Sequence, residues 1–266
     1  MSELIKSFQL RKPVTRSLTP RWNLTWVLLS LGKAPYEPLG EASMLDLTVK
    51  TAFLLSLASA RRVSEIHALS VEEGAIRFDK NQESVSLLPQ AGFLAKNQCP
   101  SIAPDIIHVP GLAAFANDSK DRLQCPVRAL RFYLARVKNR RGGRKRLFLP
   151  IVGKGDVSKD SVSRWIKRAV VLAYQRLTDR DLSFMKIKAH EVRAISTSLA
   201  FSQRIPLQDI MRAAYWHSHS TFSSFYLRSM VTQRDNVLSL GPVVAAQSVL
   251  SGGTSALVGD SGHAHS

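Results

Sequence analysis

Residues 43–65 read SMLDLTVKTAFLLSLASARRVSE, and this pattern predicts a helix with a defined start. Ser43 followed three residues later by Asp46 is a capping-box pattern, in which side chains satisfy the free backbone N–H groups of the first turn. The residues that then repeat on one helical face are Leu47, Thr51, Leu54 and Ala58. The helix therefore delivers the segment ARRVSE, residues 60–65, at its far end.

A small sheet is predicted next, because helical periodicity gives way to short β-prone runs after Ala75. The runs assigned to strands are AIRF (75–78), SVSLL (84–88) and IIHVP (106–110). Between the last two, QAGFLAKNQ is typical of a hairpin that carries Lys96 near its tip.

Helices are predicted for most of the remaining chain. Residues 125–143 have Pro126 at a helix start and Gly142 at the end, with a basic face opposite an apolar stripe. The stripe is Ala129, Leu130, Tyr133, Leu134 and Val137, and the corresponding stripe within 160–177 is Val162, Trp165, Ile166, Ala169, Ala173 and Tyr174. Shorter helical patterns cover 188–201, 206–215 and 220–230. The expected fold class is mainly α with a small antiparallel β-sheet, an α+β fold.

Composition places the chain among basic globular proteins. Its 266 residues are 45% hydrophobic, which predicts a packed core, and the formal net charge of +17 predicts attraction to a polyanion such as nucleic acid or an anionic membrane. No apolar run reaches the roughly 18 residues that span a bilayer, so membrane insertion is not expected. The two cysteines, Cys99 and Cys125, provide no disulfide framework and no zinc ribbon.

Two segments are interpreted as lying outside the main domain. KAPYEPLGEAS at 33–43 has the prolines and glycine of a linker, so 1–40 is interpreted as a linker or the remnant of an upstream domain. The main domain is assigned to 41–235. Residues 236–266 lose all periodicity and read as a flexible tail.

Chemistry-bearing residues occur in a particular order along the domain. After ARRVSE and the hairpin lysine comes HEVR, in which His190 and Arg193 stand at i and i+3 and are expected on one helix face. The stretch AYWHSHSTFSSFY, residues 214–226, then adds Trp216, His217 and a final Tyr226. A histidine and an arginine on a helix more often form a solvated face than a functional site. The evidence for a site is therefore the whole ordered series of residues and not this pair alone.

This series resembles the catalytic domain of the tyrosine recombinases, the phage-integrase superfamily. The matching motifs run from Met44 to Met230: an arginine before an apolar-Ser-Glu run, a hairpin lysine, a HxxR box, a His or Trp, and a tyrosine. Phrases such as PYEPL, CPVRALRFYL and TFSSFYLR are closest to recombinases of DIRS-like and Crypton-like mobile elements. The resemblance implies the recombinase catalytic-domain fold over 41–235 and a remnant of a core-binding domain within 1–40.

The resemblance implies a role for each matched residue. Arg62 and Arg193 hold the scissile phosphate, for which planar guanidinium groups are suited because they donate in pairs and stay ionised. Tyr226 attacks the phosphorus, His190 assists as acid or base, and Lys96 protonates the leaving 5′-oxygen. Trp216 or His217 donates an N–H to a nonbridging phosphate oxygen. This chemistry requires no metal and no cofactor.

Several assignments have alternatives. Arg62 is chosen over Arg61, which is expected as a surface or phosphate-contacting neighbour, and Lys80 competes with Lys96. Glu65 is expected either to orient a site residue or to form a local ion pair. His217 stands nine residues before Tyr226 and Trp216 ten, and we favour Trp216 slightly.

Two other interpretations of the residues in 214–226 also stay open. Tyr226 can be a core aromatic beside Phe222 and Phe225. His217 and His219 can be metal ligands, which is disfavoured because no Cys or acidic residue stands at ligand spacing.

The expected function is site-specific recombination or integration, with double-stranded DNA as the partner and a homotetramer as the assembly on DNA. Nuclear location is expected for a eukaryotic mobile element, and cytoplasmic location otherwise. The alternatives are a non-catalytic or domesticated DNA-binding derivative, and a relaxing enzyme like the type IB topoisomerases.

Overall fold

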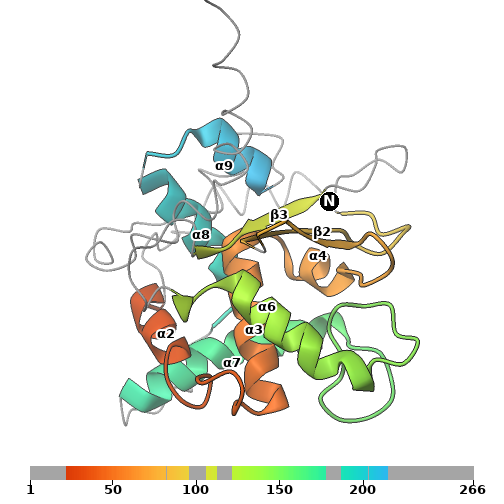
Figure 1. The fold of residues 1–266 in the computed structure, drawn as a ribbon. Coiled ribbons are helices and arrows are strands. Elements are labelled where there is room, and N and C mark those ends of the chain that lie inside the picture. Colours follow the sequence, from red (N-terminus) through yellow and green to blue (C-terminus); the bar gives the residue numbers. More distant parts are fainter. Residues whose placement is uncertain are drawn as a thin grey trace, which may run out of the picture.

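The structure is a computed structural model built around one central helix (Figure 1). It describes residues 22–81, 83–95, 106–112, 122–177, 187–202 and 204–214. The helices are α2 (Leu24–Leu31), α3 (Met44–Ser59), α4 (Val63–Ala68), α6 (Pro126–Val137), α7 (Lys159–Leu177), α8 (Glu191–Ser202) and α9 (Leu207–Ala213), with a short 3-10 helix η2 (Lys138–Arg140). The strands are β1 (Ile76–Phe78), β2 (Ser84–Leu87) and β3 (Ile107–Pro110). The predicted class, mainly helical with a small antiparallel sheet, is confirmed.

Helix α3 begins as the capping pattern predicts. The Ser43 hydroxyl accepts a hydrogen bond from the backbone N–H of Asp46 at 3.1 Å and donates to the Asp46 carboxylate at 2.6 Å. The predicted single apolar face is too narrow, because every residue from Leu47 to Ser59 is buried. α6, α7, α8 and β3 all pack against this helix, so α3 is enclosed on all sides.

The polar residues of α3 are buried without loss of hydrogen bonds. Thr48, Thr51, Ser56 and Ser59 each donate to the carbonyl four residues earlier, all at 2.7 Å. Such bonds satisfy a hydroxyl inside a core at little cost. A helix that is only partly apolar in sequence can therefore occupy the centre of the molecule.

The three strands form an antiparallel sheet in the order β1-β2-β3. Ile76 pairs with Leu87, and Val85 pairs with Val109. Val85 and Leu87 of β2 are buried, while Ser84 and Ser86 are only partly covered, which is the alternation expected of a half-buried strand. The strands predicted at 75–78, 84–88 and 106–110 are thus confirmed with small changes at their ends.

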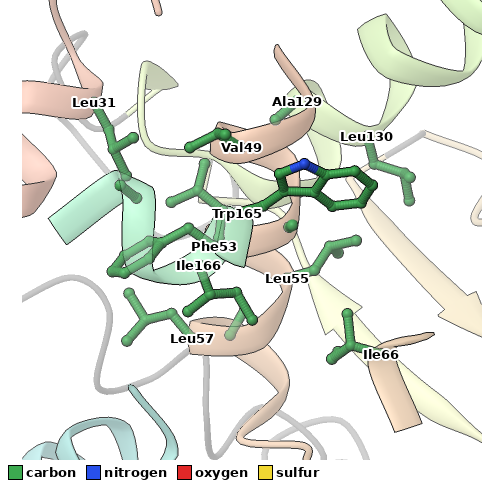
Figure 2. Packing of buried hydrophobic residues seen from close by; sticks show 14 of the residues in the cluster. Leu31, Val49, Phe53, Leu55, Leu57, Ile66, Ala129, Leu130, Trp165 and Ile166 are labelled. Atoms are coloured by element: carbon green, nitrogen blue, oxygen red, sulfur yellow. The ribbon is translucent and has the colours of Figure 1, made fainter. Parts of the chain in front are cut away.

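Helices α6 and α7 confirm the predicted amphipathic patterns. α6 starts at Pro126 and gives way after Val137 to η2, so the helix ends earlier than the glycine at 142. Side chains from α3, α6 and α7 meet in one hydrophobic cluster, with Trp165 and Ile166 of α7 beside the residues of α3 (Figure 2). This cluster is the main core of the described part of the chain.

The segment 33–43 differs from the predicted linker, because it is packed into the same core. Tyr36 and Leu39 are buried members of the main cluster. The Glu37 carboxylate accepts hydrogen bonds from both Nη atoms of Arg128, at 2.6 and 3.0 Å. It also binds the ammonium group of the fully buried Lys50. Burial lowers the pKa of Lys50 to about 8, because the nearby Glu37 offsets only part of the desolvation. The proline-rich segment is therefore joined to α3 and α6 through one buried carboxylate.

Removing this carboxylate is expected to destabilise the fold. Glu37→Gln leaves the buried Lys50 without its counter-charge, and loss of one partner of a buried pair costs about 3 kcal/mol of unfolding free energy. Urea unfolding at neutral pH measures the change. Glu41→Gln, an exposed acid in the same segment, is the control and should stay within about 0.5 kcal/mol of the wild type. Equal stability of the two variants would show that the buried pair does not hold this segment.

Candidate active site

The first part of the site is the turn that follows α3. Ala60 ends the helix in the left-handed conformation, with φ of 51°, and so redirects the chain into Arg61 and Arg62. Helix α4 starts directly afterwards and carries Glu65 in its first turn. Two arginines and a carboxylate are thereby placed within five residues of one another at the end of the central helix.

Glu65 organises both arginines. One of its oxygens accepts from Arg61 Nη1 at 3.2 Å, and the other accepts from the backbone N–H of Arg62 at 2.9 Å. Glu65 is thus a local ion-pair partner of Arg61, one of the two roles left open by the sequence, and it also holds the backbone of this turn. The carboxylate is buried, so the pairing acts where solvent does not screen it.

Arg61 and Arg62 differ in accessibility. The Arg61 side chain is 2% exposed and pairs with Glu65, so the prediction of a surface neighbour is wrong for this residue. The Arg62 side chain is 22% exposed, and its Nη1 lies 3.9 Å from the nearest Glu65 oxygen. Within the described residues this buried Nη1 atom makes no hydrogen bond. Buried donors are normally satisfied, so the Nη1 of Arg62 has donor capacity for a ligand oxygen.

His190 and Arg193 lie at the start of α8, but they do not share one exposed face. His190 precedes the helix and is exposed, and its carbonyl accepts the backbone N–H of Ala194 at 3.4 Å. Arg193 is 2% exposed and donates from Nη2 to the carbonyl of Ala214. The predicted common surface patch is therefore corrected: the i, i+3 spacing places the histidine outside and the arginine inside.

A small secondary cluster connects the two parts of the site. It consists of Ala60, Ala200, Ile210, Met211 and Ala214. Ala60 directly precedes the Arg61–Arg62 pair, and Ala214 supplies the carbonyl to which Arg193 donates. The Ser196 hydroxyl also donates to the carbonyl of Leu57 at 2.6 Å, which joins α8 to the end of α3. The turn that carries Arg61 and Arg62 therefore begins at a member of the same cluster, Ala60, that also contains Ala214, the residue to which Arg193 donates.

Four predicted site residues lie outside the described residues: Lys96, Trp216, His217 and Tyr226. Lys96 falls between β2 and β3 in sequence, and Ala214 precedes Trp216 by two residues. Their roles stay predictions. Lys80, the alternative to Lys96, is exposed in the turn between β1 and β2.

Three of the five tyrosines of the chain are described, and their environments make them poor nucleophiles. Burial raises the pKa of Tyr133 to about 12, and it also raises the pKa of Tyr36 and of Tyr174. The Tyr133 hydroxyl accepts from the backbone of Leu149 at 2.8 Å, and the Tyr174 hydroxyl accepts from Asn23 at 2.6 Å. A phenol that is hard to ionise and already bonded to the backbone is unsuited to attack a phosphate.

No protein-family model and no curated protein matches this chain. None of the helices in the described segments combines the length and the apolar character needed to cross a bilayer. In those same segments, His, Cys, Asp and Glu side chains do not gather in groups of three or more that suit a metal ion. The chemistry of the described site is that of guanidinium groups ordered by a buried carboxylate, an arrangement suited to an oxyanion.

Proposed function

We propose that this chain is a DNA strand-transfer enzyme of the tyrosine-recombinase type, acting in site-specific recombination or integration. The observation that carries the proposal is the buried Nη1 of Arg62, which has no hydrogen-bond partner in the described parts of the chain and belongs to the turn that Glu65 orders; Arg193 is a second buried arginine, on α8. A phosphodiester offers two nonbridging oxygens to such donors. The motif order around these arginines supports the same reading.

The proposed reaction transfers a phosphoryl group without loss of bond energy. The Tyr226 oxygen forms a bond to the scissile phosphorus, while the bond between phosphorus and the 5′-oxygen breaks. The tyrosine proton passes to His190, and Lys96 supplies a proton to the leaving 5′-oxygen. The product is a 3′-phosphotyrosyl bond and a free 5′-hydroxyl, so attack by another 5′-hydroxyl restores the DNA and releases the tyrosine.

The arginines are proposed to stabilise the negative charge that develops on the phosphate in this step. Negative charge grows on the nonbridging oxygens as the tyrosine attacks, and preorganised donors stabilise it most in a water-poor site. Glu65 holds the backbone of Arg62 through the 2.9 Å hydrogen bond, so the guanidinium starts from an ordered main chain. The exposed position of His190 suits it to exchange a proton with a bound substrate.

The environments of the described tyrosines narrow the choice of nucleophile. Tyr36, Tyr133 and Tyr174 are covered to different degrees and have raised pKa values, which leaves Tyr215 and Tyr226 as candidate nucleophiles. Only Tyr226 stands at the tyrosine position of the recombinase motif order. The net charge of +17 favours DNA as the partner, and a homotetramer on two duplexes is part of the proposal.

Covalent trapping tests this proposal without knowledge of the target site. The full chain is incubated with a library of nicked duplexes that are randomised around the nick, so that the short 5′-hydroxyl fragment diffuses away after cleavage. Denaturing electrophoresis isolates any protein–DNA adduct, and mass spectrometry maps the modified residue. An adduct on Tyr226 supports the proposal. DNA binding without any adduct would instead identify a non-catalytic DNA-binding derivative.

A further inference from the structure

Residues 148–156 form a loop whose two ends lie beside one histidine. At its start, Arg146 pairs with Ser70 in an isolated β-bridge, and the Leu147 N–H donates to the carbonyl of Leu69 at 2.7 Å. At its end, the carbonyl of Val157 lies 2.8 Å from His67 Nε2. His67 belongs to α4, two residues after Glu65. We use the word neck for the contacts of Arg146 and Val157 with His67.

The neck accepts only one protonation state of the imidazole. A carbonyl oxygen can only accept, so Nε2 must carry a proton to bind Val157 at 2.8 Å. A guanidinium can only donate, so Nδ1, 3.3 Å from Arg146 Nη1, must present its lone pair. The same Nη1 also donates to the His67 carbonyl at 3.2 Å. A second proton on the ring would point the Nδ1–H at an N–H of Arg146. It would also place the imidazolium cation next to the guanidinium cation.

Burial and the neighbouring cations also favour the neutral ring of His67. Burial is the main cause that lowers its pKa; Arg146 and Lys159 act in the same direction, while the Val157 hydrogen bond and Asp156 oppose it. The folded pKa is therefore below the value of about 6.5 found in an unfolded chain. As pH falls between these two values, the unfolded or opened chain takes up a proton that the closed neck does not. The contribution of the neck to stability is thus present above about pH 6.5 and is lost on acidification toward the folded pKa.

The remainder of the loop is held by groups that do not titrate near neutral pH. Arg140 donates to the carbonyls of Pro150 and Ile151 at 3.4 and 3.0 Å, and Arg144 donates to the carbonyl of Lys154 at 2.6 Å. Part of the basic run before the loop is therefore structural. His67 is the titratable contact at the neck itself.

We infer that His67 is a positioning residue whose neutral ring closes the neck and fixes the 148–156 loop to α4, the helix that carries Glu65, and that protonation of His67 opens the neck. The contacts of His67 with Arg146 and Val157 support closure of the loop. Its consequence for DNA cleavage rests on the proposed function, since α4 is the element through which Glu65 orders Arg61 and Arg62.

The first test reads the neck directly in the full chain. Nitrogen-15 NMR of the histidine side chains is expected to show His67 as the Nε2–H tautomer with a pKa below its ordinary value. Amide exchange in the loop, corrected for the intrinsic effect of pH, is expected to rise about tenfold between about pH 7.5 and about pH 5.5. His67→Gln keeps an N–H for Val157 but cannot titrate, and should show no such step.

His108→Gln is the matched control, because His108 lies in β3, where its Nδ1 contacts the Ser86 hydroxyl at 2.8 Å. This variant should keep the step in exchange. An Nδ1–H tautomer of His67 in the wild type, or the same step in the His67→Gln variant, would overturn the inference. The tautomer is measured on the wild type and stands even if a variant folds poorly.

The second test concerns positioning. Adduct yield, normalised to each protein's own value at about pH 8, should fall on acidification more steeply in the wild type than in His67→Gln. If the two proteins have identical pH profiles of adduct yield, His67 has no positioning role in cleavage. The amide-exchange measurement then still decides whether His67 closes the neck. If the chain forms no adduct with any DNA, the proposed function fails, and the tautomer and exchange measurements still decide whether His67 closes the loop.

Discussion

Tyr226→Phe is expected to abolish the covalent protein–DNA adduct while leaving DNA affinity nearly unchanged. The substitution removes only the nucleophilic oxygen, and no other tyrosine is expected to replace it. Tyr36, Tyr133 and Tyr174 have pKa values raised by burial, and the last two already accept backbone hydrogen bonds. Trapping on the randomised nicked duplexes measures the adduct, and fluorescence anisotropy on the same DNA measures affinity.

Tyr215→Phe is the matched control for this prediction. Tyr215 is the other tyrosine whose environment is not described, so it is the natural competitor for the role of nucleophile. We expect its variant to form the adduct at a rate close to that of the wild type. If the adduct still forms in Tyr226→Phe and disappears in Tyr215→Phe, the nucleophile is Tyr215. The assignment of Tyr226 as the final residue of the recombinase motif series would then be wrong.

The sequence could predict the elements because their signals are local. Ser43 and Asp46 set the start of α3, Pro126 set the start of α6, and alternation along β2 indicated one buried face. It could not predict that α3 is enclosed on all sides. The hydroxyls of Thr48, Thr51, Ser56 and Ser59 bind carbonyls of their own helix, and such bonds leave no trace in a hydrophobic pattern.

The linker interpretation of 33–43 was wrong for a related reason. Proline and glycine indicate an irregular backbone, but they say nothing about burial. The partners of Glu37 are Lys50 and Arg128, which are 13 and 91 positions away, so the ion network that holds this segment is a product of tertiary structure. A lysine in the middle of an apolar helix was the available sign that a carboxylate had to be buried nearby.

Within the site, sequence spacing indicated the residue types better than their exposure. The motif register selected Arg62, and the structure adds that Arg61 is the buried partner of Glu65. The HxxR spacing placed His190 and Arg193 one helical turn apart, whereas α8 begins only after His190. One residue at a helix start therefore decides whether a side chain faces solvent or the core, and helix starts are the least certain feature of a sequence pattern.

Arg62→Lys is expected to reduce the rate of adduct formation by about a hundredfold to a thousandfold with little loss of stability. A lysine keeps the charge but cannot donate two parallel hydrogen bonds to a phosphate, and removal of one preorganised donor has an effect of about this size. The folded state loses little, because Arg62 Nη1 lies 3.9 Å from Glu65 and the 2.9 Å bond to Glu65 comes from the backbone. Single-turnover trapping and urea unfolding measure the two quantities.

Arg61→Lys is the matched comparison, since the two arginines are adjacent and share Glu65. The Arg61 side chain is buried and donates to Glu65 at 3.2 Å, so this variant should lose about 1.5–3 kcal/mol of unfolding free energy. Its adduct formation, measured at equal folded fraction, should stay close to that of the wild type, because Arg62 remains. The opposite pattern, with cleavage lost in Arg61→Lys and retained in Arg62→Lys, would make Arg61 the phosphate ligand. Glu65 would then hold the catalytic arginine by its side chain, and the accessible Arg62 would be a surface cation.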